Sequence, residues 1–282
     1  MNICIIGPKG SKVSLQIKLR AEERGHICRR IKLSDTYFAI ENNKFTAKHR
    51  KLELKDFDVF VFRTIANVDK EIASTLAQYL SSQGKKVLDP RLTKRSDTNL
   101  SYTYELVTNN LPVLETVITS GLKSSRDVLM DLAHPIIVKP DQSRKERFTV
   151  SYDWTDSYDI VRTESSKKFE FQQLAESDKF IRVYTIGNEV IGGLQKTITA
   201  HDNKLNYSDK FSNEVIEINN EISSLCKKIN KVLDLTFTQI DLVEVDGEYK
   251  IAEVKRAPDF RLFTKLSGIN YADKLIDYIE KL

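Results

Sequence analysis

The sequence predicts an α/β and α+β protein, in which a Rossmann-like parallel sheet comes first and mixed α+β structure follows. Three observations predict this fold class. Residues 2–33 alternate strand, helix and strand, which is the pattern of a parallel βαβ unit. A polar stretch at 90–99 separates this first part from the rest. Strand-like runs at 179–198 and 237–258 each turn at a glycine, which indicates antiparallel pairs.

The first part opens with a buried strand, "NICIIG" at 2–7, and a helix at 11–25. The apolar residues of that helix alternate, which taken alone is a strand period. Ser11 as a cap, a run of helix formers and Gly25 as a stop favour a helix instead. The remaining elements of this part are expected to be strands at 26–33, 56–64 and 85–89 and a helix at 68–84.

The second part begins with a helix that Ser96 or Asp97 is expected to cap. Helices are predicted at 96–110, 125–133 and 270–282, and the stretch 213–234 is expected to contain a further long helix. Strands are predicted at 111–119, 135–140 and 169–176, beside the pair at 179–198 and the hairpin at 237–258. The terminal helix is expected to bury one apolar face, made of Ala272, Leu275, Ile276 and Ile279.

Composition narrows the function classes. A net charge of +4, from 44 basic and 40 acidic residues, is a weak argument for nucleic acid, which is not an expected partner. The three cysteines and four histidines lack metal-ligand spacing, so buried free thiols in a cytoplasmic protein are expected. No run approaches the roughly 18 apolar residues of a membrane helix, and the start does not resemble a signal peptide.

The hairpin at 237–258 concentrates polar residues that could form a site. Glu253 and Lys255 are two residues apart, so on a strand their side chains point to the same face. A two-residue turn at 246–247 would put Asp241 and Glu253 on opposite faces. The turn therefore decides whether these two carboxylates meet.

A three-residue loop at 246–248 separates polar from apolar residues better, and we predict it on that ground. A loop at 245–247 keeps the same faces. The loop at 246–248 sets Asp241 opposite Glu253, Ile240 opposite Val254, Leu242 opposite Ala252 and Glu244 opposite Lys250. Charged groups that converge at the end of a sheet are costly unless they are paired or bind a cation. This end of the hairpin is therefore a candidate ion site, with an exposed polar patch as the alternative.

The order of segments resembles the ATP-grasp superfamily, in particular its branch of RimK-like ribosomal-protein glutamate ligases and amino-acid-adding ligases. The segments are "PIIVKP", "FEFQQLAE", "FIRVYTIGNEVIGG", "FTQIDLVEVDGEYKIAEVKRAP" and "LSGINYADKLIDYI". The resemblance covers about residues 90–282. It implies an N-terminal domain at 1–92 and two α+β lobes, at 93–176 and 177–282, that clamp ATP.

The resemblance also implies an activity. Such enzymes are ATP-dependent carboxylate–amine ligases that form an amide or peptide bond through an acyl phosphate, with ATP and Mg²⁺ as cofactors. The expected substrates are small-molecule or peptide carboxylates and amines, and a homo-oligomer stays open. An inactive ATP-grasp protein that binds a nucleotide or a partner is the alternative, and a phosphotransferase on the same fold is a further one.

The resemblance assigns roles to residues that match the motifs of the family. Lys139 would reach the ATP phosphates, and Arg182 matches the arginine of a D-I-R motif. Lys196 stands where a phosphate-facing arginine is usual, so the charge is kept but the bidentate fork is lost. Asp241 and Glu253 would bind Mg²⁺, which prefers oxygen ligands. The adenine would lie along Gln172, Gln173, Leu174 and Ala175, where the family usually has Glu at the position of Gln173.

The sequence also departs from the motifs of the family. The first phosphate lysine falls on Asn99, and the ribose-binding acid falls on Phe180, for which Asp178 or Glu176 could substitute. The lid "SRKERF" at 143–148 contains no glycine, although a lid that wraps phosphates usually needs it. Lys255 stands at the third metal ligand, normally an asparagine. Lys255 could therefore replace one Mg²⁺, pair with the carboxylates or contact a phosphate.

Overall fold

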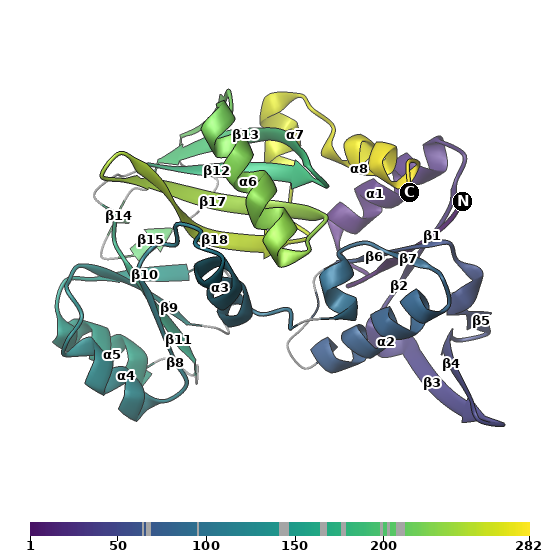
Figure 1. Ribbon diagram of the computed structural model, residues 1–282, viewed down its shortest axis with the longest axis horizontal. Helices are drawn as coiled ribbons and strands as arrows, with labels where there is room; N and C mark the ends of the chain where they lie inside the picture. Colours follow the sequence, from purple (N-terminus) through teal and green to yellow (C-terminus); the bar gives the residue numbers. More distant parts are fainter. Residues whose placement is uncertain are drawn as a thin grey trace.

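The structure is a computed structural model. It describes residues 1–63, 65, 69–94, 96–140, 147–163, 168–175, 179–197, 200–201, 204–206 and 212–282. Within these residues the strands form separate sheets of four, six, five and three strands rather than one continuous sheet. Figure 1 shows the three larger sheets as distinct bodies that follow the chain from the N-terminus.

The first sheet is parallel and has the strand order β2-β1-β6-β7. Its elements are β1 (Asn2–Ile6), α1 (Lys12–Glu23), β2 (Ile27–Ile31), β6 (Val59–Phe62), α2 (Lys70–Ser82) and β7 (Lys86–Val87). Ile3 and Ile5 pack on the side of α1, whereas Cys4 and Ile6 pack on the side of α2. Both faces are thus covered, as in most parallel sheets, and the predicted βαβ unit is confirmed.

Helix α1 resolves the ambiguity between a strand and a helix. Ser11 caps it, because the hydroxyl oxygen of Ser11 accepts a hydrogen bond from the backbone N–H of Ser14 at 3.1 Å. Val13 and Ile17 are buried, while Leu15 lies on the exposed face. A buried pair four residues apart is the helical period, so the alternation in the sequence was accidental.

A three-stranded sheet that the sequence did not predict is inserted in the first part. It consists of β3 (Thr36–Glu41), β4 (Lys44–His49) and β5 (Leu52–Glu53) and protrudes from the molecule (Figure 1). Short 3₁₀ helices at Leu33–Asp35 and Leu54–Asp56 flank it, and another follows at Pro90–Thr93. Phe45 packs against Phe38 and against Tyr79 of α2, with ring centroids 5.4 and 5.2 Å apart, which anchors the hairpin.

The second sheet has the strand order β14-β15-β10-β9-β11-β8. Its elements are β8 (Thr116–Thr119), α4 (Leu122–Leu129), β9 (Ile136–Pro140), β10 (Arg147–Ser151), α5 (Trp154–Thr163), β11 (Phe169–Gln173), β14 (Ala200–His201) and β15 (Lys204–Asn206). Helices α4 and α5 share one apolar core with β9 and β11. The strand predicted at 111–119 begins only at Thr116, because the preceding residues instead pair with Ile251.

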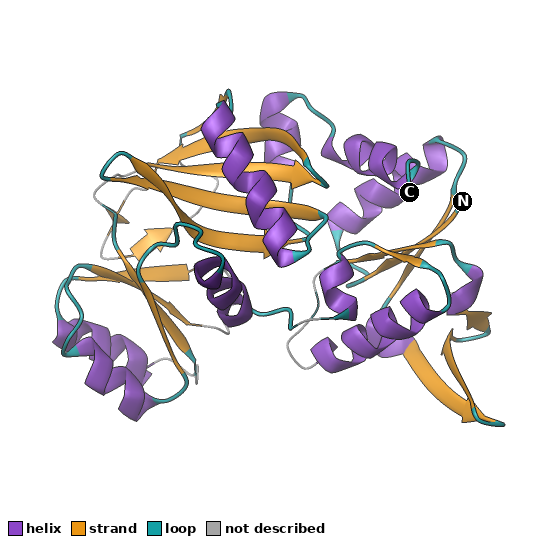
Figure 2. Cartoon of the chain, viewed as in Figure 1, coloured by secondary structure: helices purple, strands orange, loops and turns teal. Residues whose placement is uncertain are grey.

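The third sheet is antiparallel, with the strand order β16-β13-β12-β17-β18. Its strands are β12 (Lys179–Ile186), β13 (Glu189–Thr197), β16 (Asn213–Ile216), β17 (Phe237–Val245) and β18 (Glu248–Arg256). Helices α3 (Asn99–Thr108) and α6 (Asn220–Leu233) bury one of its faces, and Figure 2 shows α6 lying across it. On the opposite face, Tyr184, Ile186, Leu194 and Phe237 join the core that includes the two helices at the end of the chain, and the rest carries the polar residues discussed below.

The chain returns to the first sheet at its end. Helix α7 (Arg261–Ser267) leads to α8 (Tyr271–Ile279), which lies beside α1 in Figure 1. The predicted apolar face of α8 is confirmed, since Ala272, Leu275, Ile276 and Ile279 are all buried in the core that includes α1. The C-terminal helix therefore ties the third sheet to the first.

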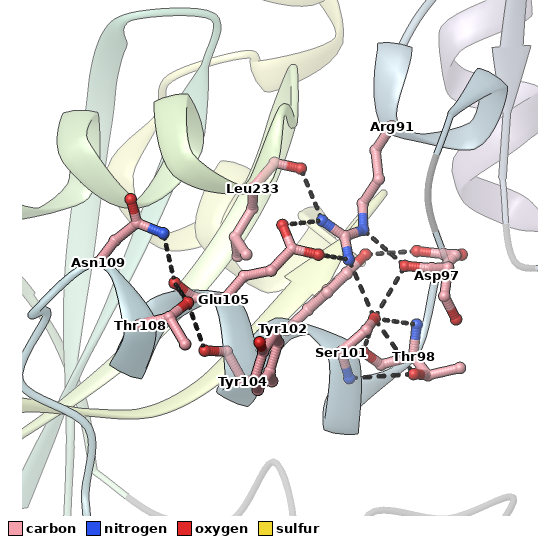
Figure 3. A network of polar contacts seen from close by, with 11 residues as sticks. Arg91, Asp97, Thr98, Ser101, Tyr102, Tyr104, Glu105, Thr108, Asn109 and Leu233 are labelled. Carbon is pink, nitrogen blue, oxygen red and sulfur yellow. Dashed lines mark hydrogen bonds and ion pairs between the residues drawn. The ribbon is translucent and has the colours of Figure 1, made fainter.

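Helix α3 is fixed by a buried arginine on the segment that precedes it (Figure 3). The Arg91 guanidinium donates to both carboxylate oxygens of Glu105, at 3.0 and 2.7 Å, and to the Leu233 carbonyl at 3.1 Å.

The residue that caps α3 is Thr98, so the expected cap at Ser96 or Asp97 was wrong. Asp97 uses its carboxylate elsewhere, accepting from the hydroxyl of Tyr102 and the guanidinium of Arg256.

All three cysteines are buried and free, as expected. In the part of the chain that the structure describes, no helix has the length and apolar character needed to cross a membrane.

Candidate functional site

The hairpin of β17 and β18 closes with a two-residue turn, so the predicted three-residue loop was wrong. Val245 pairs with Glu248 across the turn. Asp246 and Gly247 both have positive φ, 53° and 77°. Two such residues give a turn whose twist matches the right-handed twist of the strands. The local geometry of Asp-Gly therefore decides the turn.

A β-bulge then restores the predicted meeting of the carboxylates. Asp241 pairs with Glu253, but Leu242 pairs with Ile251, so Ala252 is an extra residue in β18. The pairs Asp241–Glu253 and Ile240–Val254 are confirmed. The predicted pairs Leu242–Ala252 and Glu244–Lys250 are wrong, since these residues lie between the bulge and the turn.

The bulge connects the third sheet to the second. The Ala252 carbonyl accepts a hydrogen bond from Gln172 Nε2 at 3.1 Å. Gln172 Oε1 in turn accepts from Lys139 Nζ at 2.6 Å, and Lys139 also pairs with Glu170 at 3.1 Å. Gln172 is buried, and its hydrogen bond to the Ala252 carbonyl links the second sheet to the third. Lys139 is thereby held one side chain away from the strand that carries Glu253.

Asp241 is held by an arginine fork. Arg182 Nε and Nη2 donate to its two carboxylate oxygens at 2.9 and 2.8 Å, and Gln239 Nε2 lies 3.2 and 3.3 Å from the same atoms. Asp241 is only 4% exposed. Burial alone would raise the pKa of this carboxyl, but Arg182, Lys255 and Lys196 outweigh burial and lower it. Asp241 is therefore a buried, ionised carboxylate.

Glu253 has a cation of its own. Lys255 Nζ lies 3.0 Å from Glu253 Oε2, and both side chains keep some exposure, 29% for Lys255 and 17% for Glu253.

Lys196 and Arg182 flank the ring of Phe180, at 5.9 and 5.6 Å from its centroid. Sequence reasoning placed Phe180 where the family has a ribose-binding acid. The structure buries this phenylalanine beneath the two cations.

The predicted adenine segment lies at the end of β11. The N–H groups of Gln173 and Leu174 donate to the carbonyls of Glu115 and Pro135, at 3.0 and 3.4 Å. Gln173 Oε1 is buried and has no hydrogen-bond partner among the described residues. Ala175 packs against an apolar cluster of Leu114, Phe180 and Val243. Asp178, Glu176 and most of the basic lid at 141–148 lie outside the described residues.

A cleft of about 690 Å³ opens where the first part, α3 and β18 meet. The charged side chains that line it are Lys70 of α2, Asp97 just before α3, Lys168 just before β11, and Glu253, Lys255, Arg256 and Asp259 on or after β18. Asn99, the first residue of α3, lines it too, and also lines a smaller pocket beside Gln172 and Ala252. Lys255 and Glu253 thus face a space large enough for a ligand.

Two residues of the site were missed by sequence reasoning. Glu170, the partner of Lys139, stands directly opposite it on β11, and the alternation of "FEFQQ" carried that signal. Arg256 was read only as part of a motif. It donates to the Phe62 carbonyl at 2.6 Å and to Asp97 at 3.2 Å, contacts that no local pattern predicts.

The chain is similar in sequence to a known domain family and to known ligases. The RimK-like ATP-grasp domain matches residues 106–279. The chain is 22% identical over 250 residues to the alpha-aminoadipate–LysW ligase LysX of Saccharolobus solfataricus, covering 85% of this chain and 87% of the relative. It is 24% identical over 252 residues to the tetrahydromethanopterin:alpha-L-glutamate ligase of Methanocaldococcus jannaschii, covering 84% of each.

Solved structures show the same fold. The ATP-grasp ligase PsnB, in complex with a variant precursor, Mg and ADP, aligns with a TM-score of 0.75 at 16% identity, over 99% of this chain and 97% of PsnB. The D-cycloserine synthetase DcsG aligns with a TM-score of 0.73 at 13% identity, over 100% and 99%. The chain belongs to the RimK-like ATP-grasp family and is an ATP-dependent ligase that forms amide bonds, with ATP and Mg²⁺ as cofactors.

Proposed function

We propose that this ligase adds an amino acid, through its amine, to the carboxylate of a small molecule or peptide. The observation that carries the proposal is the cleft of about 690 Å³, in which Glu253 and Lys255 meet charged groups from the rest of the chain. We further propose that residues 1–92, 93–176 and 177–282 act as the N-terminal domain and the two ATP-clamping lobes.

The nucleotide site that we propose runs along the second and third sheets. The adenine would lie at residues 172–175, where Gln173 Oε1 is a buried acceptor without a partner among the described residues. The exocyclic amino group of adenine could supply the donor. The adjacent cluster of Leu114, Phe180 and Val243 would contact the ring. From there the phosphates would extend toward Lys139, and then toward the cations around Asp241.

The donor set fits Mg²⁺ in part. Asp241 and Glu253 present oxygen ligands from paired positions on adjacent strands. Bound there, Mg²⁺ would neutralise charge on the phosphate oxygens. Among the described residues no group of three His, Cys, Asp or Glu side chains gathers to hold a metal. The chain itself supplies the remaining positive charge, through Arg182, Lys196 and Lys255.

The chemistry that we propose follows from this charge. A substrate carboxylate oxygen attacks the γ-phosphorus of ATP, the bond to the β–γ bridging oxygen breaks, and ADP leaves. The amine then attacks the acyl carbon, inorganic phosphate leaves, and the amine loses a proton. The cations stabilise charge that moves among phosphate oxygens during the first step. The positions of Arg182, Lys196 and Lys255 on one sheet suit this role.

The amine substrate is proposed from the chemistry of the cleft and from the relatives. Lys70 and Lys168 could bind carboxylates, while Asp259 could bind an ammonium group. A zwitterion matches such a mixed lining. The two relatives named above have names that specify alpha-aminoadipate and alpha-L-glutamate. We therefore propose an amino acid of this acidic type.

Trapping the intermediate tests the proposed function. The protein is incubated with ATP, Mg²⁺, hydroxylamine and a panel of amino acids and short peptides as carboxylates. We expect hydroxamate and ADP to form in equal amounts with at least one carboxylate. Glu253→Gln should abolish both products, whereas Glu244→Gln, at an exposed position of the same hairpin, should not. ADP formation without hydroxamate for every carboxylate would contradict acyl phosphate chemistry.

A further inference from the structure

The sheet face beside the cleft carries two carboxylates, Asp241 and Glu253, and cations that compensate them. Asp241 and Glu253 are directly opposite each other on β17 and β18. Each has a cation within contact distance, Arg182 Nη2 at 2.8 Å from Asp241 and Lys255 Nζ at 3.0 Å from Glu253. Lys196 adds a third cation that acts on Asp241, so the chain itself supplies more positive than negative charge on this face. A pair of acidic residues on its own would instead need cations from solution.

The two carboxylates differ in how they could accept a metal ion. Both oxygens of Asp241 already accept hydrogen bonds from Arg182, and the residue is almost completely buried. A metal ion would have to displace one arm of this fork. Glu253 is more accessible, lines the cleft, and is paired through one oxygen. The donors therefore suit one divalent ion at Glu253 better than two ions shared by both residues.

Lys255 stands where a second ion would have to enter. It is on the same strand and face as Glu253, two residues further along, and it lines the same cleft. Its charge also acts on the Asp241 carboxylate. A second divalent ion placed between these carboxylates would be repelled by the ammonium, because like charges at short range in a partly buried site are costly.

We propose that Lys255, together with the Arg182 fork, takes the place of one divalent cation, so that this ligase binds its nucleotide with a single metal ion. The inference rests on the proposed nucleotide site. A lysine fixed to the chain is present at every metal concentration. A plot of the logarithm of nucleotide affinity against the logarithm of metal concentration should therefore have a slope of about one, which corresponds to one bound ion.

Counting metal ions tests this proposal. Equilibrium dialysis with Mn²⁺ and saturating AMP-PNP gives the number of Mn²⁺ ions per chain. We expect one for the wild-type protein and two for Lys255→Asn, which replaces the ammonium with an amide oxygen that can bind metal. Lys250→Asn makes the same substitution on the same strand, away from the cleft, and should keep one. Two ions, or none, on the nucleotide-bound wild-type protein would overturn the proposal.

A second measurement does not depend on nucleotide. Without metal, Lys255→Asn removes the ammonium that pairs with Glu253, so its melting temperature should fall below that of Lys250→Asn. Added Mg²⁺ should raise the melting temperature of Lys255→Asn more than that of the wild-type protein. Equal responses of both proteins to Mg²⁺ would overturn the proposal. Failure of AMP-PNP to bind at all would instead contradict the proposed function.

Discussion

Arg182 and Asp241 show how a single residue pair sets the charge of the site. The fork makes two hydrogen bonds, at 2.9 and 2.8 Å, inside a nearly closed environment. Replacing a buried pair as a whole is often tolerated, whereas removing one partner leaves a charge without compensation. Arg182 is thus required by Asp241 whatever else it does during catalysis.

Arg182→Gln should destabilise the protein by about 3–5 kcal/mol at pH 7. Arg182 holds the pKa of Asp241 below its ordinary value. The pair therefore stabilises the fold above the unfolded pKa of about 3.9, and this contribution is lost as the pH falls through the lower folded pKa. The gap in unfolding free energy between wild type and variant should narrow once the pH falls below about 4, as measured by urea unfolding from about pH 7 to about pH 2. A constant gap would argue against an ionised Asp241.

Lys139→Ala should weaken ADP binding by about 1.5–3 kcal/mol, the usual contribution of a charge-assisted hydrogen bond. The substitution also leaves Glu170 without its ammonium partner, so a loss of stability has to be measured separately. Lys48→Ala is the matched control, since Lys48 also pairs with a glutamate, Glu53 at 3.9 Å, on the distant inserted sheet. Calorimetry that gives the same affinity for both variants would remove Lys139 from the phosphate site.

Single residues of the site could be predicted only where a pattern or a family motif contained them. Asp241 and Glu253 share a face because the period of a strand is two. The partner of Asp241 could not be predicted, because Arg182 reaches it from a strand 59 residues earlier. Arg256 is a similar case, since its contacts join three distant parts of the chain.

At the scale of elements, the hairpin of β17 and β18 is the most instructive. Its register at Asp241 was predicted correctly for the wrong reason, because a bulge at Ala252 compensates for the shorter turn. The pattern of faces constrains the register but not the way in which it is reached. The bulge adds a contact that the pattern does not show, the hydrogen bond from Gln172 to the Ala252 carbonyl.

Gly247→Ala tests the turn. Gly247 has φ of 77°, and a Cβ atom there would meet nothing within 4 Å. The cost should therefore be conformational alone, about 1 kcal/mol of unfolding free energy. Gly10→Ala is the control, because Gly10 is equally open but does not have a positive φ. Equal melting temperatures for the two variants would contradict a turn that requires a left-handed residue.

Other elements could be predicted only where the local sequence indicated their secondary structure strongly. Helix α1 was predictable from its cap and composition. The inserted sheet of β3, β4 and β5 was missed, since its strands mix lysines with apolar residues and lack a glycine turn. Its turn uses Asn42 and Asn43, both with positive φ. Asparagine tolerates that conformation, so the dipeptide Asn42-Asn43 was a sequence pattern from which the turn could be predicted.

At the scale of the whole molecule, Asp89 and Arg256 connect the first part to the third sheet. Asp89 Oδ1 accepts from the N–H groups of Thr236 and Phe237 at 2.7 and 3.3 Å. Its Oδ2 lies 3.5 Å from Arg256 Nη1. Asp89 is completely buried. The strand that carries Glu253 and Lys255 therefore ends in a contact that fixes the position of the N-terminal part.

Asp89→Asn should change how stability depends on pH. Burial raises the pKa of Asp89 to about 6, although Arg256 and the two backbone donors oppose the rise. A raised pKa means that the folded protein binds this proton more tightly than the unfolded chain, so stability increases as the pH falls from 7 toward 4. Asparagine does not titrate. We expect wild type to gain about 2 kcal/mol relative to the variant over this range, as measured by urea unfolding. Parallel pH profiles would contradict a raised pKa.

A crystal structure with AMP-PNP and Mn²⁺ tests most directly whether this sheet face binds the phosphates of ATP. We expect the adenine beside residues 172–175 and the phosphates between Lys139 and Lys255. One Mn²⁺ should appear in the anomalous map, bound to Glu253, with the Arg182 fork on Asp241 intact. A nucleotide bound elsewhere would contradict this assignment of the sheet face. A Lys255 side chain that points away from the nucleotide phosphates would contradict it too.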